Sequence, residues 1–192
     1  MSDKRLAKRT QIIEASIDLF ANNGFWNTPT SKITKHAKVS TGTLFNYFES
    51  KDALIDEVYL QLREEQTQHL ASGFPVDKPV KARFEHTWFR YIEWGLQNPI
   101  RYRLLQQMKL SDLISSEAQE RSNANMELAV GSIKEAMQDG LFGEVSAEYL
   151  GHLIFAQLNI AVSYATRHNL TDMSLTKHIA RSFEIFWAGV TS

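Results

Sequence analysis

Apolar side chains recur three and four positions apart along almost the whole chain, and runs of strict polar–apolar alternation are absent. A spacing of three to four places side chains on one face of an α-helix, whereas a half-buried strand needs a period of two. The pattern therefore predicts an all-α protein of about nine helices. Turn-forming residues interrupt it at Asn22-Asn23-Gly24, Ser72-Gly73-Phe74-Pro75 and Asn98-Pro99, where helices are expected to end.

The N-terminal part of the chain is predicted to form one long helix followed by two short ones. The long amphipathic helix covers roughly residues 4–22. Thr28 and Pro29 have the residue types of an N-cap and a first helical position, and they open the first short helix. After a tight connection, Ser40 caps a second short helix over about residues 41–48. Two short helices joined by a tight turn are the parts of a helix-turn-helix, whose second helix enters the major groove of DNA.

The second short helix carries side chains suited to nucleic acid. Its exposed residues are predicted to be four that can hydrogen-bond bases or phosphates: Thr41, Thr43, Asn46 and Tyr47. Leu44, Phe45 and Phe48 are expected to share its inward and flanking faces. The alternative interpretation is a small three-helix unit inside a bundle core. A buried helix, however, would not spend four of seven positions on Thr, Asn and Tyr.

Charge is distributed unevenly, although the net charge of the chain is only −1. Residues 1–48 hold seven Lys and Arg against three Asp and Glu, a balance of +4, so the remainder carries −5. Three of these lysines, Lys32, Lys35 and Lys38, fall on or directly after the first short helix. A basic N-terminal part on an acidic body indicates that only this part meets phosphates.

A specific combination of residues extends over about residues 8–60. Its members are Gly24-Phe25, Thr28, Ile33, Ala37, Val39-Ser40, Gly42-Thr43-Leu44-Phe45, Tyr47-Phe48, Ser50-Lys51-Asp52 and Leu54. Together they resemble the N-terminal signature of the TetR/AcrR family. The sequence departs from that signature at Pro29, Thr34, Lys38 and Phe45, where the family usually has Thr, Ala, Gly and Tyr. Lys38 places a side chain where the turn favours a left-handed residue, at a cost in backbone strain.

The resemblance implies a TetR-type helix-turn-helix domain over residues 5–65 that binds double-stranded DNA. The residues that map onto DNA contacts of the family are Thr28, Ser40, Thr41, Thr43, Asn46, Tyr47 and Lys51. Tyr47 and Lys51 are expected to anchor the protein on phosphates. Thr41, Thr43 and Asn46 are expected nearer the base edges, which specify sequence.

Residues 66–192 are expected to form a ligand-sensing and dimerisation domain. The last two predicted helices, about 146–168 and 174–190, are strongly apolar, and the resemblance implies that they form a four-helix interface with a second copy of the chain. The interface residues expected there are Leu158, Val162, Ile179, Phe183, Phe186 and Trp187. The alternative is that this stripe is intramolecular core. A symmetric dimer would read a palindromic operator.

The middle helices are rich in aromatic and thioether side chains, and the resemblance implies a small-molecule pocket in this region. The residues expected to line it are Phe84, Trp88, Tyr91, Tyr102, Met126, Phe155 and Asn159. Such a lining suits an apolar or flat aromatic effector held by one or two polar contacts. The alternative is that these large side chains simply fill the core.

Several classes of protein are excluded by what the sequence lacks. There is no cysteine, so disulfides and Cys-ligated zinc are excluded and a reducing compartment fits best. No metal site, phosphate loop or catalytic motif is recognised, so neither a cofactor nor enzyme activity is expected. No signal peptide or convincing membrane span is found, and a cytoplasmic protein is expected.

The sequence thus predicts a homodimeric, ligand-responsive transcriptional regulator, in keeping with family habit a repressor. Two other functions remain open. A constitutive DNA-binding protein would share the N-terminal part but have a solid C-terminal core. A helical interaction module would not bind DNA at all.

Overall fold

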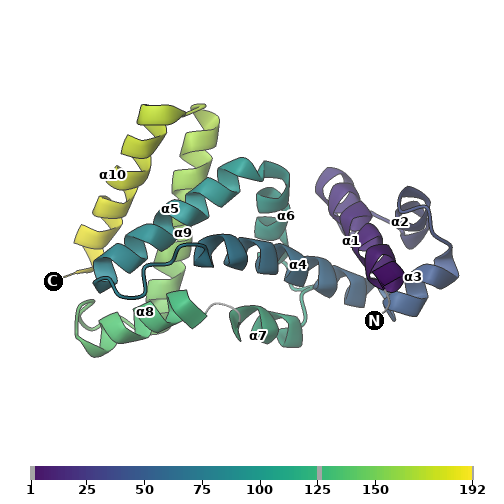
Figure 1. Ribbon diagram of the computed structural model, residues 1–192, viewed down its shortest axis with the longest axis horizontal. Helices are drawn as coiled ribbons and strands as arrows, with labels where there is room; N and C mark the ends of the chain where they lie inside the picture. The colour runs from purple at the N-terminus through teal and green to yellow at the C-terminus, as the bar shows by residue number, and fades with distance from the viewer. Residues whose placement is uncertain (1–2, 125–126, 192) are drawn as a thin grey trace. The chain divides into compact units, whose positions relative to one another are not determined.

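The computed structural model describes residues 3–124 and 127–191, and every regular element in them is an α-helix (Figure 1). The all-α prediction is therefore confirmed for this part of the chain. The helices are α1 Asp3–Asn23, α2 Thr30–His36, α3 Thr41–Tyr47, α4 Lys51–Ala71, α5 Val80–Gln97, α6 Pro99–Lys109, α7 Ser116–Ala124, α8 Glu127–Gln138, α9 Ala147–Arg167 and α10 Asp172–Val190. They number ten rather than nine because the segment predicted as one helix over 116–139 contains both α7 and α8.

The chain folds into two compact units. The first comprises residues 1–65 and 99–124, and the second comprises residues 66–98 and 125–192. The expected boundary between residues 65 and 66 coincides with a division between the units, at a point inside α4. Residues 99–124, which were expected in the C-terminal domain, lie instead with the N-terminal unit.

Ionic contacts join α6 to the helices of the N-terminal part. The Arg101 guanidinium lies 2.6 Å from a carboxylate oxygen of Glu14 in α1 and 3.2 Å from one of Glu65 in α4. Arg103 also donates to the main-chain carbonyl of Ala21, over 3.4 Å. These side chains are polar and lie far apart in sequence, so apolar periodicity gave no signal of their contact.

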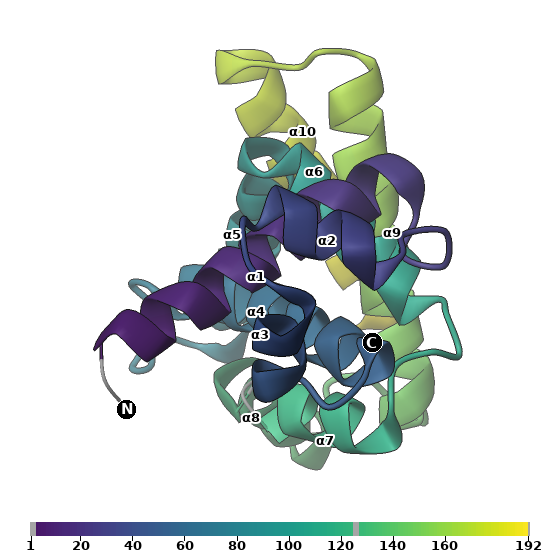
Figure 2. The same ribbon diagram turned by 90° about the vertical axis from the view of Figure 1, so that its right-hand side faces the viewer.

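Helices α1, α2 and α3 surround a small apolar core in the first unit (Figure 2). Its fully buried side chains include Ile12, Phe20, Phe25, Ile33 and Leu44. The rings of Phe20 and Phe25 meet edge to face with their centroids 6.3 Å apart. Each of the two short helices is anchored in this core by an apolar residue, Ile33 of α2 and Leu44 of α3.

The turns around the short helices follow local sequence rules with one exception. Gly24 ends α1 with a φ of +78°. Lys38, in the turn between α2 and α3, has a φ of +49°, the left-handed conformation that was expected where the family usually has Gly. The predicted start of α2 was wrong. Pro29, rather than Thr28, occupies the N-cap position, and it makes no side-chain cap bond. The Thr28 hydroxyl instead donates to the carbonyl oxygen of Gly24, 2.8 Å away.

In the second unit, α5 packs against α8, α9 and α10, and α9 and α10 lie side by side (Figures 1 and 2). Trp88 of α5 stacks on Phe186 of α10 at 4.8 Å between ring centroids and donates its indole N–H to Ser182. Among the described residues, no helix is long and apolar enough to cross a membrane.

Candidate nucleic-acid interface and cavity

Helix α3 divides into an inward apolar face and an outward polar face. Leu44 and Phe48 are buried, while Thr41 and Asn46 are exposed and Tyr47 is half-buried. The expected outward position of Thr41 and Asn46 is therefore observed. Phe45 was expected on the inward or flanking face, but 44% of it is exposed, because the inward face is already completed by Leu44 and Phe48 at a spacing of four.

Ser40 caps α3 as predicted. Its hydroxyl oxygen accepts from the Thr43 main-chain N–H at 3.0 Å and lies 2.8 Å from the Thr43 hydroxyl. Two hydroxyls expected at the DNA surface are thus held against each other at the first turn of the helix. Together these two bonds order the first turn of α3.

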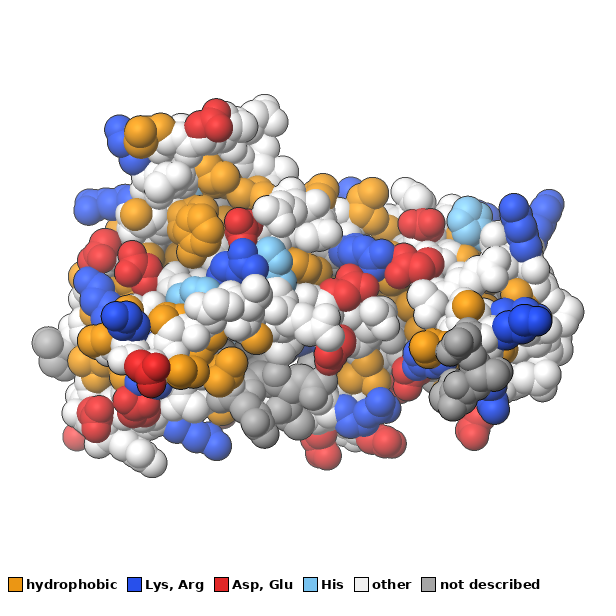
Figure 3. All heavy atoms as spheres, viewed as in Figure 1, with side chains coloured by type: hydrophobic (Ala, Val, Ile, Leu, Met, Phe, Trp, Pro, Cys, Tyr) orange, Lys and Arg blue, Asp and Glu red, His pale blue; other side chains and the backbone are white. Residues whose placement is uncertain are grey.

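Basic groups flank α3 on neighbouring elements. The Arg5 guanidinium lies over the Tyr47 ring at 5.9 Å, and that of Arg9 lies over the Phe48 ring at 5.7 Å. Lys51 donates to the main-chain carbonyl of Trp26 over 3.1 Å. Blue Lys and Arg side chains mark the end of the space-filling view that holds α1 to α3 (Figure 3). Of the basic residues counted in the sequence, Arg5 and Arg9 therefore lie beside the end of α3, and Arg9 is also paired with Glu57 of α4.

One residue of the expected DNA-contacting set is out of reach. Thr28 is completely buried, and its hydroxyl is occupied by the Gly24 carbonyl. Its role is structural, since it ties the turn after α1 to the start of α2. Conversely, Arg5 and the exposed Trp26 lie beside the expected contacts but were not proposed from the sequence. Arg5 could have been found only as one of several basic residues in α1.

The aromatic residues expected to line a pocket are mostly core. Phe84 meets Phe142 and Trp187 edge to face at 5.6 and 5.5 Å, and Trp88 lies against α10. Tyr91 is also buried in α5. Three further residues are only partly buried and do not share one unit: Tyr102 lies in the first, while Phe155 and Asn159 lie in the second. Met126 lies outside the described residues.

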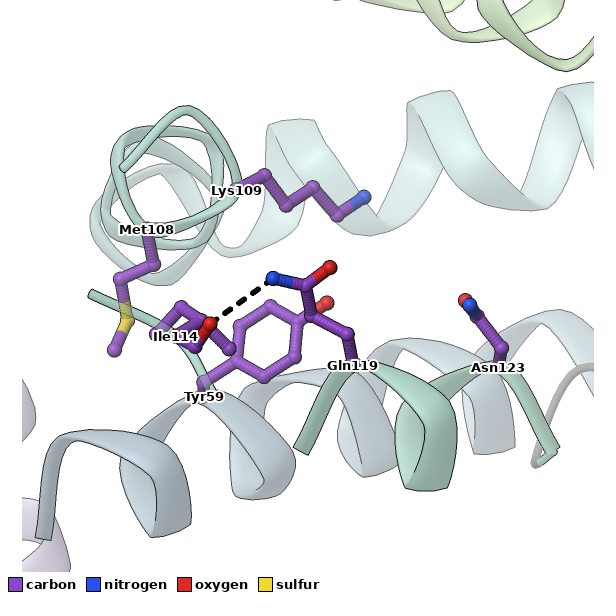
Figure 4. A pocket seen from close by; sticks show the side chains of 6 residues that line it. All are labelled: Tyr59, Met108, Lys109, Ile114, Gln119 and Asn123. Atoms are coloured by element: carbon purple, nitrogen blue, oxygen red, sulfur yellow. Dashed lines mark hydrogen bonds between the residues drawn. The ribbon is translucent and has the colours of Figure 1, made fainter. Parts of the chain in front are cut away.

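A cavity of about 100 Å³ lies instead within the first unit, among α4, α6 and α7 (Figure 4). Its lining residues are Tyr59, Met108, Lys109, Ile114, Gln119 and Asn123. Burial lowers the pKa of Lys109 well below its usual value of 10.5, and the nearby Arg63 guanidinium lowers that pKa further. None of the seven residues expected to line a ligand pocket is among the six that line this cavity.

Most of the apolar residues expected at a dimer interface are buried within one chain. Five of them are buried inside the second unit: Leu158, Val162, Ile179, Phe183 and Phe186. The sixth, Trp187, is half-buried against Phe84 and Phe142. The alternative of an intramolecular core is therefore the correct one for the five buried residues. The outer face of the helix pair presents other apolar side chains, among them Ile160, Tyr164 and Ile185.

Comparison with known proteins agrees with this arrangement. Residues 12–58 match the family model described as "Bacterial regulatory proteins, tetR family". The HTH-type transcriptional regulator UidR of Escherichia coli K12 is 41% identical over 56 residues, which are 29% of this chain and 29% of UidR. The expected resemblance to the TetR/AcrR family is therefore confirmed in the helix-turn-helix segment.

Solved structures extend the likeness of fold to nearly the whole chain. A putative tetR family transcription regulator from Shewanella sp. PV-4 superposes with a TM-score of 0.88 at 24% identity, covering 96% of this chain and 98% of that one. The regulator FadR of Bacillus subtilis, solved in complex with stearoyl-CoA, gives 0.73 at 17% identity, covering 94% and 98%. At these identities the likeness is one of fold.

Proposed function

Because residues 12–58 match the tetR family model, we propose that the protein is a homodimeric transcriptional regulator that binds a palindromic operator in double-stranded DNA. We further propose that it is a repressor and that a small-molecule effector releases it. The observation that carries the proposal is the exposed polar face of α3, with the Arg5 guanidinium over its Tyr47 ring. A DNA-binding protein of this kind would act in the cytoplasm.

The proposed roles of the α3 residues follow from their exposure. Thr41 and Asn46 project outward from the helix and are placed to read base edges in the major groove. Ser40 and Thr43 are paired at the N-terminus of α3, where hydroxyl and main-chain N–H groups suit a phosphate. Tyr47 and Lys51 would hold the flanking backbone, which positions the protein without specifying sequence. Thr28 is withdrawn from the contacting set because it is buried.

Dimerisation is proposed through the outer face of α9 and α10. Ile160 is 64% exposed, Tyr164 49% and Ile185 53%, although all three are large and apolar. Exposed apolar residues gathered on neighbouring helices are typical of a surface that another protein covers. A second copy of the same helix pair would cover them symmetrically and present two recognition helices to the two halves of a palindrome.

Effector release is proposed to act through contacts within the first unit. The cavity is lined by residues of α4, α6 and α7, and Arg101 of α6 pairs with both Glu14 of α1 and Glu65 of α4. A ligand that displaced α6 would therefore alter contacts of the two helices that support the helix-turn-helix. By linkage, the operator must weaken effector affinity by the same factor as the effector weakens operator affinity.

Fluorescence anisotropy with labelled DNA from around the protein's own gene tests the proposal. Lys51→Ala should weaken binding to operator and random DNA alike, and should lower the slope of log affinity against log salt by about one. Asn46→Ala should mainly relax the preference for operator, by about 1–3 kcal/mol. A protein that binds neither DNA would contradict the proposed function, and equal losses on both DNAs for Asn46→Ala would contradict the assigned role.

The rival function is a constitutive DNA-binding protein without an effector. It is favoured by the aromatic packing of Phe84 and Trp88, because these two residues were expected to line a pocket but are part of the core. It is opposed by the cavity in the first unit. A thermal-shift screen of small molecules on the full chain separates the two, since only a ligand-responsive protein should be stabilised by a specific compound.

A further inference from the structure

The outward face of α3 carries one large apolar side chain among polar ones. The exposed residues of this helix are Thr41, Gly42, Phe45 and Asn46, and their spacing of one, three and four positions places them on one continuous face. Phe45 is 44% exposed, whereas Leu44 beside it is completely buried. The face that is proposed to enter the major groove is therefore polar at Thr41 and Asn46 and apolar at Phe45.

The Phe45 ring borders a position that has no side chain. Side chains in a helix lean towards its N-terminus, so the ring lies over the preceding turn, which holds Thr41 and Gly42. Apart from the adjoining residues and the helix backbone, a methyl group at Gly42 would meet nothing closer than the Ser40 hydroxyl oxygen, at 4.0 Å. The ring is therefore open to a partner on its Gly42 side.

The chemistry of the ring decides which groups of a DNA duplex suit it. A phenyl ring neither donates nor accepts an ordinary hydrogen bond, so it leaves a phosphate oxygen or a polar base edge that it covers unpaired, at a cost in free energy. One group in the major groove is apolar, the 5-methyl group of thymine. Contact with this methyl group removes apolar surface of both partners from water. Attraction to thymine and the penalty at other bases therefore favour the same choice.

The residue that follows Phe45 favours the same base pairs. Asn46 carries an amide, which suits the N6 and N7 atoms of adenine. Since Phe45 and Asn46 are adjacent on α3, the bases they meet should lie within about two base pairs of each other, at roughly 3.4 Å per pair. The pair of residues thus fits a half-site with A·T pairs at this point.

We propose that Phe45 is a specificity-determining residue, which selects thymine at one position of each operator half-site by packing its ring on the 5-methyl group. Asn46 reads a neighbouring pair through hydrogen bonds, so the two residues use different chemistry on one face. A side chain that was expected on the inward or flanking face of α3 thereby becomes part of its reading surface. This role rests on the proposed function, since it applies only to a chain that reads DNA with α3.

Removing single methyl groups from the DNA tests the proposal. Fluorescence anisotropy with the full chain compares the operator with duplexes in which one thymine at a time is replaced by deoxyuridine, which pairs identically but lacks the methyl group. At one thymine of each half-site, this replacement should weaken wild-type binding about fourfold, which is the ~0.8 kcal/mol of one buried methylene group converted at 1.4 kcal/mol per tenfold. At the same position, 5-methylcytosine should bind better than cytosine by a similar factor. Wild-type affinity unchanged by every replacement would overturn the proposal.

Substitutions at Phe45 connect the methyl effect to its ring. Phe45→Ala should bind the thymine and deoxyuridine duplexes equally, and its salt dependence should match that of the wild type, because the ring carries no charge. Phe45→Tyr keeps the ring and should keep the difference between the duplexes. Asn46→Ala, at the neighbouring exposed position, is the matched control, and it should bind the operator more weakly but keep that difference as well.

A purely structural role of Phe45 predicts a different result. A loosened α3 would weaken binding to both duplexes alike and would leave the effect of the methyl group in place. Circular dichroism establishes that the variants are folded. A methyl effect that persists in a folded Phe45→Ala protein would therefore assign thymine recognition to another residue and contradict the proposal.

The role of Phe45 and the proposed function fail in distinguishable ways. A protein that prefers operator to random DNA but binds thymine and deoxyuridine duplexes equally keeps the proposed function and loses the role of Phe45. A protein that binds neither operator nor random DNA contradicts both.

Discussion

At the scale of single residues, two lysines occupy positions that disfavour them. Lys38 adopts a left-handed conformation that costs residues with a Cβ roughly 1–2 kcal/mol. Lys109 carries an ammonium group in an environment that lowers its pKa. The first could be anticipated from a motif, because the family usually has Gly there. The second could not, because only tertiary contacts bury the amine.

Replacing Lys38 by Gly should stabilise the protein. Gly adopts a φ of +49° without a clash, and its greater freedom in the unfolded chain offsets part of the gain, so about 0.5–1 kcal/mol is expected. Urea denaturation followed by circular dichroism measures it. Lys35→Gly in α2, where Gly is unfavourable, is the matched control and should destabilise by about 1 kcal/mol. A loss of stability in Lys38→Gly would disprove strain at this position.

Replacing Lys109 by Met should also stabilise the ligand-free protein, in a pH-dependent way. The pKa of Lys109 is lower in the folded than in the unfolded chain, so the cost of burying the charge is complete below the folded pKa. It disappears as the pH rises from there towards 10.5, because the folded protein releases the proton. The gain in Tm should therefore be largest at low pH and smallest near pH 10. Thermal denaturation across this range checks it, and a gain that grows with pH would contradict it.

At the scale of elements, the short helices depend on local capping and on one small core. Helix α3 has only seven residues, too few to be stable alone. It is held by the Ser40 cap and by Leu44 and Phe48 on its inward face. The recognition surface is therefore only as well ordered as these few contacts allow.

Ser40→Ala should affect stability modestly and DNA binding strongly. Loss of the N-cap bond to Thr43 costs about 1 kcal/mol, and the same change loosens the end of α3 that is proposed to meet DNA. Ser146→Ala provides the control, since Ser146 caps α9 in the same way in the other unit. Denaturation and anisotropy should show similar losses of stability for both variants, but a loss of operator affinity for Ser40→Ala only. Equal affinities for the two would exclude the contribution of the α3 cap.

At the scale of the whole molecule, the division into two units assigns functions to segments that are not contiguous. The first unit contains the helix-turn-helix and the cavity, because α6 and α7 return to it after α5. The second unit contains the buried aromatic core and the exposed apolar face of α9 and α10. The chain passes from the first unit to the second inside α4, between residues 65 and 66, and returns between α5 and α6, between residues 98 and 99.

Ile160→Arg should convert the proposed dimer to a monomer. Ile160 is 64% exposed, so the substitution should cost the single chain little, whereas an unpaired charge inside an interface typically costs several kcal/mol. Size-exclusion chromatography with light scattering measures the mass. Leu110→Arg is the control, because Leu110 is 82% exposed on the other unit. A dimer that survives Ile160→Arg but not Leu110→Arg would place the interface elsewhere.

The sequence by itself determined the features that depend on neighbouring residues. Helical periodicity, the Gly24 stop and the Ser40 cap arise within a few positions, and each was predicted from those positions, whereas the left-handed Lys38 was expected from the family resemblance. The exposed positions of Thr41 and Asn46 could also be predicted, because burying Leu44 and Phe48 fixes which face of this short helix points outward.

Only the tertiary structure decided how the apolar helices use their faces. Phe84 and Trp88 proved to be core, and the buried stripe that includes Phe183 proved to be intramolecular. The cavity by Lys109 had no sequence signal at all. Apolar periodicity indicates that one face of a helix is buried, but it does not indicate what buries that face. Packing against the same chain, against a second copy or against a ligand favours the same apolar side chains.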